Sequence, residues 1–203
     1  MENKEIQEQR IRGYFIQAAK ETLKGEGLKT LNVRNVADRA GYSYATLYNY
    51  FRDLKDLVFE CVRDFQEECE AFVRSETAAA PHGIEGVRAK AKAYAKYFVQ
   101  YPGIFELFFI ERISDVGSKR PTLELIFRSL DRACTDEWNY CISKNIASAD
   151  EAERMSAAMR YSLAGLLLFY INRRHPESYQ QFIMALDTQL ENVLGPHNGP
   201  ITG

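Results

Sequence analysis

Apolar residues recur every three or four positions along almost the whole 203-residue chain, and this helical spacing constrains the fold more than any other feature. The last such stripe is the clearest, and it consists of Tyr179, Phe182, Ile183, Leu186, Leu190 and Val193. Strand signals are nearly absent, because no Asn-Gly or Asp-Gly turn separates two runs of alternating polarity. The sequence therefore predicts an all-α protein with about nine helices.

The predicted helices form two domains and a tail. The composition changes near the segment SETAAAPHG, residues 75–83, and Gly195 followed by proline ends the last helix. We expect one long helix to cross the domain boundary without a flexible linker. The expected parts are a three-helix domain over residues 1–58, a second helical domain over residues 59–195 and a flexible tail over residues 196–203.

Two helices of the second domain have limits that the sequence predicts. Pro102 ends a helix over residues 84–101, because the residue before a proline disfavours helical geometry. Farther along, one continuous helix is expected to carry the apolar stripe from Leu123 to Cys141.

Charge is distributed unevenly along the chain. The net charge is −2, so the chain as a whole is not drawn electrostatically to DNA or to an acidic membrane. Residues 29–55 hold five cations and two carboxylates, a net +3, so the other 176 residues sum to −5. A mildly basic segment on an acidic body is compatible with nucleic-acid binding.

The sequence shows no membrane signal. Its longest apolar run, residues 163–171, is about half of the ~20 residues needed to cross a bilayer. The chain also opens on a polar segment rather than on a charged and then apolar leader. The protein is therefore expected to be cytoplasmic, with no membrane partner.

No constellation of catalytic residues appears in the sequence. There is no GxSxG, no HExxH and no glycine-rich phosphate loop, and the three histidines fall at predicted helix ends or in the tail. The four cysteines lie within helical patterns without a CxxC pair, which favours reduced, buried thiols over a metal site or a redox sensor. We expect a protein that is not an enzyme and that needs no metal or cofactor.

The stretch NVRNVADRAGYSYATLYNYFRDLKDL, residues 32–57, has the signals of two short helices joined by a tight turn. Asn32 is a good N-cap for a helix over residues 33–40. Gly41 suits the left-handed residue that ends this helix, and Ser43 can cap the next one. Two short helices joined by a turn that contains glycine form a helix-turn-helix layout.

The second of these helices presents polar and aromatic side chains away from the core. On a helical wheel Leu47 and Phe51 point inward, while Thr46 and Asn49 point outward with the neighbouring tyrosines. A helix in the DNA major groove can use a threonine methyl against thymine and an asparagine against adenine, while tyrosine hydroxyls reach phosphates. The alternative is a plain three-helix packing unit whose tyrosines cover the core.

The segment TLNVRNVADRAGYSYATLYNYFRDLKDL, residues 30–57, resembles the DNA-binding signature of TetR-family transcriptional regulators. The likeness covers residues 10–60, and the stretch YPGIFELFF, residues 101–109, is similar to the start of the regulatory domain in one branch of that family. The resemblance implies an all-α homodimer with an N-terminal DNA-reading domain and a C-terminal domain that binds an inducer.

The resemblance also implies which residues contact DNA. The positions that match are Arg34, Ser43, Tyr44, Ala45, Thr46, Tyr48, Asn49, Tyr50 and Lys55. Two positions depart from the family pattern, which usually has a cation in the place of Tyr44 and a phosphate-binding lysine in the place of Leu54. Here the nearest cation is Lys55, about 100° farther around the helix. Fewer cations predict a shallower salt dependence of DNA binding.

Two stripes near the C-terminus carry more apolar surface than a chain leaves in water. Each stripe could pack inside its own domain, but the resemblance favours pairing with the same two helices of a second subunit, with Gly165 permitting close approach. The candidate interface residues are Leu163, Leu166, Tyr170, Phe182, Leu186 and Leu190.

The middle of the chain is rich in aromatic residues at helical spacing, which most often indicates a packed core. A functional interpretation adds an enclosed, mostly apolar cavity for a small effector. The candidate effector-binding residues are Phe98, Phe105, Phe109, Phe127 and Trp138.

The leading hypothesis is a transcriptional repressor that binds a palindromic operator in double-stranded DNA as a homodimer and is released by a small, largely apolar effector. One alternative is a helical interaction protein that keeps the fold but has lost specific DNA reading, which the missing lysine at position 54 favours. A third, a small-molecule-binding or catalytic all-α protein, has no residues in its favour.

Overall fold

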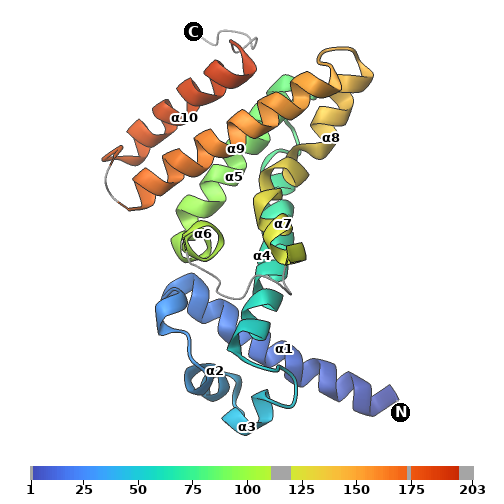
Figure 1. Cartoon of the computed structure of the whole chain (residues 1–203), viewed down its shortest axis with the longest axis vertical. Helices are drawn as coiled ribbons and strands as arrows, with labels where there is room; N and C mark the ends of the chain where they lie inside the picture. Colours follow the sequence, from blue (N-terminus) through green and yellow to red (C-terminus); the bar gives the residue numbers. More distant parts are fainter. Residues whose placement is uncertain (1, 111–119, 173–174, 197–203) are drawn as a thin grey trace. The chain divides into compact units, whose positions relative to one another are not determined.

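The computed structural model describes residues 2–110, 120–172 and 175–196, and in this part of the chain every regular element is helical (Figure 1). The prediction of an all-α fold is confirmed. The α-helices are α1 (Glu2–Gly25), α2 (Val33–Ala40), α3 (Tyr44–Leu47), α4 (Leu54–Glu76), α5 (Ile84–Gln100), α6 (Pro102–Phe109), α7 (Arg120–Phe127), α8 (Ser129–Ser143), α9 (Ala149–Ile171) and α10 (Tyr179–Leu194), and a short 3-10 helix covers Leu28–Thr30.

The helix predicted to run from Leu123 to Cys141 is two helices in the structure. Arg128 leaves helical geometry, with φ −96° and ψ 13°, and separates α7 from α8. This break explains why the described residues form ten α-helices rather than about nine. The apolar stripe continues across the break, so spacing alone did not reveal it.

The chain divides into two compact units. The N-terminal unit contains Met1–Glu67 and Tyr101–Ile126, and the C-terminal unit contains Glu68–Gln100 and Phe127–Gly203. The boundary predicted after residue 58 lies inside α4, which begins in one unit and ends in the other. The N-terminal unit also takes in α6, which the sequence analysis placed in the second domain. The predicted tail over residues 196–203 lies almost wholly outside the described residues.

The N-terminal unit is built around an aromatic core. Phe15 of α1 and Phe51 are almost fully buried, and their rings meet edge to face with centroids 6.4 Å apart. Leu47 of α3 is also completely buried, which anchors that very short helix to the core. Burying a side chain of this kind contributes about 1.5–3 kcal/mol, which is far more than the intrinsic stability of a single helical turn.

The same unit contains an unusually close contact between α1 and α6. A Cβ added to Gly103 would lie 2.3 Å from the carbonyl oxygen of Leu23, so only glycine fits there without a shift of the backbone. Nearby, the ammonium of Lys24 lies 5.1 Å from the ring centroid of Tyr101. Helix α6 is therefore fixed directly against the helix that supports the helix-turn-helix.

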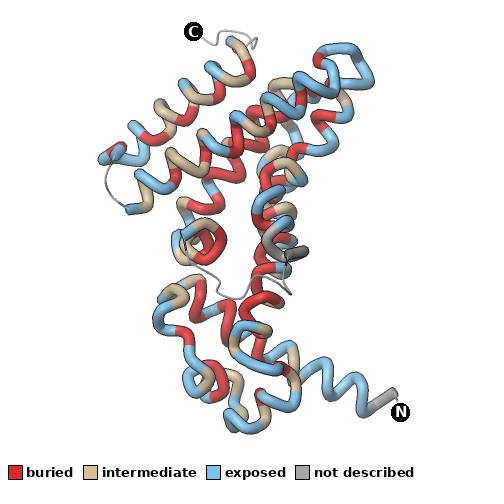
Figure 2. The backbone as a smooth tube through the Cα atoms, viewed as in Figure 1, coloured by how far each residue is buried: buried red, intermediate tan, exposed pale blue. Residues whose placement is uncertain are grey.

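Helix α5 is the central helix of the C-terminal unit and packs against α8, α9 and α10. Most of its residues are buried, as Figure 2 shows. Phe98 of α5 and Phe182 of α10 are completely buried. In the described part of the chain, no helix is both long enough and apolar enough to span a bilayer.

Candidate nucleic-acid interface

Local hydrogen bonds fix the limits of the two short helices. The side chain of Asn32 accepts the N–H of Asn35 at 3.0 Å, and Oγ of Ser43 accepts the N–H of Thr46 at 3.2 Å. Between the helices, Gly41 adopts left-handed geometry with φ 77° and ψ 26°. The caps and the glycine turn predicted from the sequence are confirmed, and together they form a helix-turn-helix.

The outward face of α3 is aromatic and open. The exposed fractions of Tyr44 and Tyr48 are 59% and 51%, and Ala45 and Asn49 are exposed as well. These tyrosines do not cover the core, because more than half of each is in water. A packing role alone therefore leaves two large apolar rings at the surface unexplained.

The remaining candidates on this segment are less accessible. Tyr50 is half-buried, and its ring lies 6.1 Å from that of Phe15, so it belongs partly to the core. Thr46 is also half-buried, and its hydroxyl oxygen lies 2.9 Å from that of Ser43. This contact holds the threonine side chain in one position at the start of α3.

The cations around the helix-turn-helix differ in whether a carboxylate forms an ion pair with them. Arg39 forms an ion pair with Glu26, so its charge is already matched. Arg34 on α2 is exposed, and no carboxylate of the described residues pairs with it. Lys55 is exposed at the start of α4, whereas Leu54 is half-buried. The charge of Arg34 is therefore not matched by any carboxylate of the described residues.

The structure also brings α1 beside the end of α3, which the sequence analysis missed. A hollow of about 420 Å³ is lined by Glu8, Gln9 and Arg12 of α1 together with Asn49 and Tyr50. Asn49 therefore lies beside residues of α1, since they line the same hollow. Contacts of this kind join residues almost 40 positions apart, and the spacing within one helix gives no signal for them.

Residues 15–61 match the family model of bacterial regulatory proteins of the tetR family. Over these residues the chain has the DNA-binding domain of the TetR family. The matched segment contains the whole helix-turn-helix and the start of α4. The matched segment is therefore a DNA-binding domain of that family's type, and the outward face of α3 is the candidate reading face.

Solved structures of TetR-family regulators have the same fold. FadR of Bacillus subtilis in complex with stearoyl-CoA has a TM-score of 0.70 at 13% identity, over 91% of this chain and 98% of that one. A regulator from Marinobacter aquaeolei VT8 has a TM-score of 0.60 at 15% identity, over 95% and 98% of the two chains. A search of curated proteins gave no match. At such identities the likeness extends to the fold alone.

The candidate dimer residues lie mostly inside the regulator's own core. Leu163 of α9 and Phe182, Leu186 and Leu190 of α10 are at most 2% exposed. Since a side chain inside its own protomer cannot form an outer contact, the predicted interface needs a correction. Leu166 and Tyr170 are half-buried. The apolar residues that α9 and α10 do expose are Tyr161, Leu168, Phe169, Tyr179 and Met184.

The candidate effector residues are divided between the two units. Phe105 and Phe109 belong to the N-terminal unit, and their ring centroids are 5.0 Å apart. Phe98 and Trp138 are buried in the C-terminal unit, whereas Phe127 is 41% exposed. The indole N–H of Trp138 is buried and has no hydrogen-bond partner among the described residues. Phe98 and Trp138 remain candidates for one site. Phe127 belongs to the same unit but is exposed, and Phe105 and Phe109 belong to the other unit.

The four cysteines are buried and unpaired. Burial raises the pKa of Cys61 and of Cys134 to about 12, so both remain protonated thiols at neutral pH. A protonated thiol is a poor nucleophile and a poor metal ligand. The described residues also contain no group of three or more His, Cys, Asp or Glu side chains that could hold a metal ion.

We expect the substitution Ser43→Ala to lower the free energy of unfolding by about 0.5–2 kcal/mol, because the N–H of Thr46 loses its side-chain acceptor. Urea unfolding of the full chain measures the loss. Ser43→Asn is the matched control, since asparagine is an equally good cap and should restore most of the stability. If both variants lost the same free energy of unfolding, the loss of the helix cap would not explain the destabilisation.

Proposed function

We propose that this TetR-family regulator is a homodimeric repressor that binds a palindromic operator and leaves it when a small effector binds. The observation that supports this most is the outward face of α3, where Tyr44, Ala45 and Tyr48 stand exposed beside a fixed Ser43–Thr46 start. In a helix-turn-helix protein the first residues of the second helix reach the base edges, and their neighbours contact phosphates. Repression follows when the bound protein occupies DNA that the transcription machinery needs.

A homodimer is supported by the exposed faces of α9 and α10. On α9 the outer residues Ala158, Tyr161, Gly165 and Leu168 follow helical spacing and carry no charge. A Cβ added to Gly165 would meet no heavy atom within 4 Å, so packing inside the protomer does not require glycine there. A small, uncharged stripe suits close contact with its own copy across a two-fold axis. Two reading helices would then meet half-sites about 34 Å apart.

Release by an effector is supported by the fold and by one structural relative. The B. subtilis FadR structure holds stearoyl-CoA, a ligand with a long apolar chain. In this chain Phe98 and Trp138 offer buried aromatic surface in the C-terminal unit. We propose a largely apolar effector that binds the DNA-free state more tightly, since a ligand shifts an equilibrium only by its differential affinity.

A footprinting experiment on the DNA that flanks the protein's own gene tests this proposal. A protected, symmetrical site of two half-sites supports it, and an apolar compound that removes the protection supports the effector. The alternative function, a helical interaction protein without specific DNA reading, is favoured by Leu54, which is half-buried where the family usually has a phosphate-binding lysine. Uniform weak protection without a preferred site would favour that alternative.

Two substitutions separate base reading from phosphate contact. We expect Thr46→Ala to change the order of preference among operator variants, by about 1–3 kcal/mol at the base pair it faces. Arg34→Gln removes a phosphate contact instead, so it should weaken all sequences about equally and reduce the salt slope by about one. Fluorescence anisotropy titrations on two operator variants at several salt concentrations measure both effects. Identical losses for the two variants on both sequences would contradict the assigned roles.

A further inference from the structure

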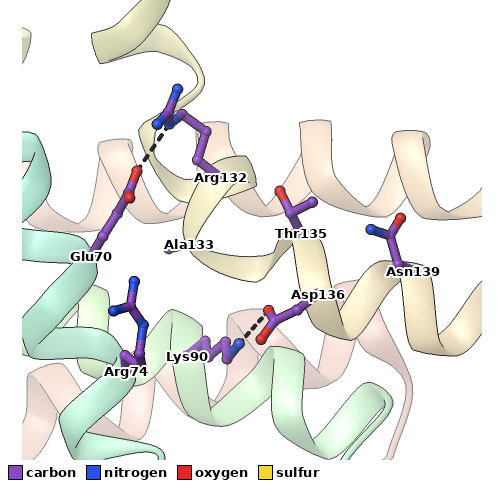
Figure 3. A pocket seen from close by; sticks show the side chains of 8 residues that line it. All are labelled: Glu70, Arg74, Lys90, Arg132, Ala133, Thr135, Asp136 and Asn139. Atoms are coloured by element: carbon purple, nitrogen blue, oxygen red, sulfur yellow. Dashed lines mark hydrogen bonds and ion pairs between the residues drawn. The ribbon is translucent and has the colours of Figure 1, made fainter.

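A polar pocket of about 300 Å³ lies in the C-terminal unit, between side chains of α4, α5 and α8 (Figure 3). Its lining includes three cationic side chains, those of Arg74, Lys90 and Arg132, and two carboxylates, those of Glu70 and Asp136. None of the aromatic candidates for the apolar effector lines it. The pocket is therefore a separate site with different chemistry.

Two of the three cationic side chains already form ion pairs with carboxylates of the pocket. Nε of Arg132 lies 2.9 Å from Oε1 of Glu70, and Lys90 forms an ion pair with Asp136. Burial raises the pKa of Asp136, but the hydrogen bond and the charge of Lys90 outweigh this and leave the pKa below its ordinary value. Asp136 thus stays ionised beside Lys90, and these two pairs offer no free charge to a ligand.

A second carboxylate holds Lys90 in place. Glu137 is buried on α8, and its Oε1 lies 3.7 Å from Nζ of Lys90. The other oxygen of Glu137 accepts the backbone N–H of Gly83 at 2.9 Å, and Nδ1 of His82 lies 3.2 Å from Oε1. Glu137 is not part of the pocket lining. Lys90 is therefore a fixed part of the pocket wall rather than a mobile surface cation.

Arg74 is the third cationic side chain of the pocket, and it has no ion-pair partner among the described residues. No carboxylate of the described residues pairs with its guanidinium, and Figure 3 shows the side chain on the α4 wall of the pocket without an ion-pair partner. The lining carries three cations and two carboxylates, a net +1, which suits a ligand with a single negative charge. A planar guanidinium binds a carboxylate through two parallel hydrogen bonds.

Thr135 and Asn139 on α8 add neutral polar groups to the pocket. The Thr135 hydroxyl donates to the carbonyl of Asp131 at 2.9 Å, so toward a ligand its oxygen can act only as an acceptor. The amide of Asn139 can both donate and accept. A pocket of about 300 Å³ lies at the small end of the usual range for ligand sites. We propose that it binds a small polar carboxylic acid, with the carboxylate on Arg74 and hydroxyl or oxo groups on Thr135 and Asn139.

Nuclear magnetic resonance titrations of the full-length protein test this inference without DNA. The probes are sodium lactate, pyruvate and gluconate at constant ionic strength, and lactamide is the neutral counterpart of lactate. We expect at least one acid to produce saturable shifts of the backbone amides of residues 70–74 and 132–139, and lactamide to produce none. Arg74→Gln should weaken binding by about ten- to a hundredfold, as the loss of a charge-assisted contact implies. Arg154→Gln, an exposed arginine of α9 outside the pocket, should leave it unchanged.

Several outcomes would overturn the inference. One is that none of the three acids gives saturable shifts in protein that circular dichroism shows to be folded. Another is that Arg74→Gln binds as tightly as the parent, which would place the acid elsewhere. Inorganic phosphate serves as a further probe, and binding of phosphate without any of the acids would assign a different anion. Because no operator is present, a failure here leaves the proposed role in transcription untouched.

Discussion

Replacing Gly165 by glutamate is expected to convert the proposed dimer into monomers and to lower affinity for a full palindromic operator by about 10²–10⁴-fold. The glycine is half-buried on the outer stripe of α9, and a side chain added there meets open space inside the protomer. The protomer should therefore fold normally, while two glutamates that face each other across the two-fold axis repel each other. Each half-site would then bind alone, without the effective concentration that linkage supplies.

Sedimentation velocity measures the change in mass, and anisotropy titrations on the full operator and on a single half-site measure the change in affinity. Half-site binding should change little, because the reading face of α3 is untouched. Ile142→Glu is the control, since it places the same charge on an exposed apolar position of α8 rather than of α9 or α10. If Gly165→Glu remains a dimer, the proposed interface lies elsewhere.

Replacing Gly103 by alanine should lower the free energy of unfolding by about 1–3 kcal/mol, the usual cost of forcing extra atoms into a packed contact. The added Cβ would stand 2.3 Å from the carbonyl oxygen of Leu23, and a backbone atom cannot move aside as the end of a flexible side chain can. Helix α6 must shift away from α1. Because α1 supports the helix-turn-helix, operator affinity should fall together with stability.

Gly13→Ala is the matched control for this substitution. Gly13 lies within α1, and a Cβ added there meets no heavy atom within 4 Å. Alanine favours the helix over glycine by about 0.5–1 kcal/mol, so this variant should gain stability. Urea unfolding of both variants measures the two effects. A Gly103→Ala variant as stable as Gly13→Ala would contradict the close approach of α1 and α6.

The start of each short helix and the end of α2 could be predicted nearly to the residue because their signals are local, whereas the end of α3 at Leu47 could not. A cap such as Ser43 acts on an N–H three positions away, and Gly41 adopts its geometry without help from distant residues. The inward direction of Leu47 and Phe51 follows from helical periodicity within one short segment. Each of these features involves neighbours in the sequence, so the sequence contains the whole signal.

The apolar stripes of α9 and α10 were a different case. Periodicity showed correctly that Leu163, Phe182 and Leu186 share faces that avoid water, but it does not say whether such a face is covered by the same chain or by a second one. The structure places these residues in the protomer's own core. The outer face includes Gly165, whose small size the sequence analysis noted, but periodicity did not show that this glycine lies on the outer face.

The sequence by itself determined the helical fold, the limits of α2, the start of α3 and the exposure of Tyr44, Tyr48 and Asn49, because propensity, capping and periodicity act over a few positions. Only the tertiary structure decided that α6 belongs with the N-terminal unit, that Asn49 lies beside α1 and that Arg74, Lys90 and Arg132 line one pocket. These arrangements depend on which helices pack together. That choice is set by the fit of many side chains at once, so no single segment of the sequence contains it.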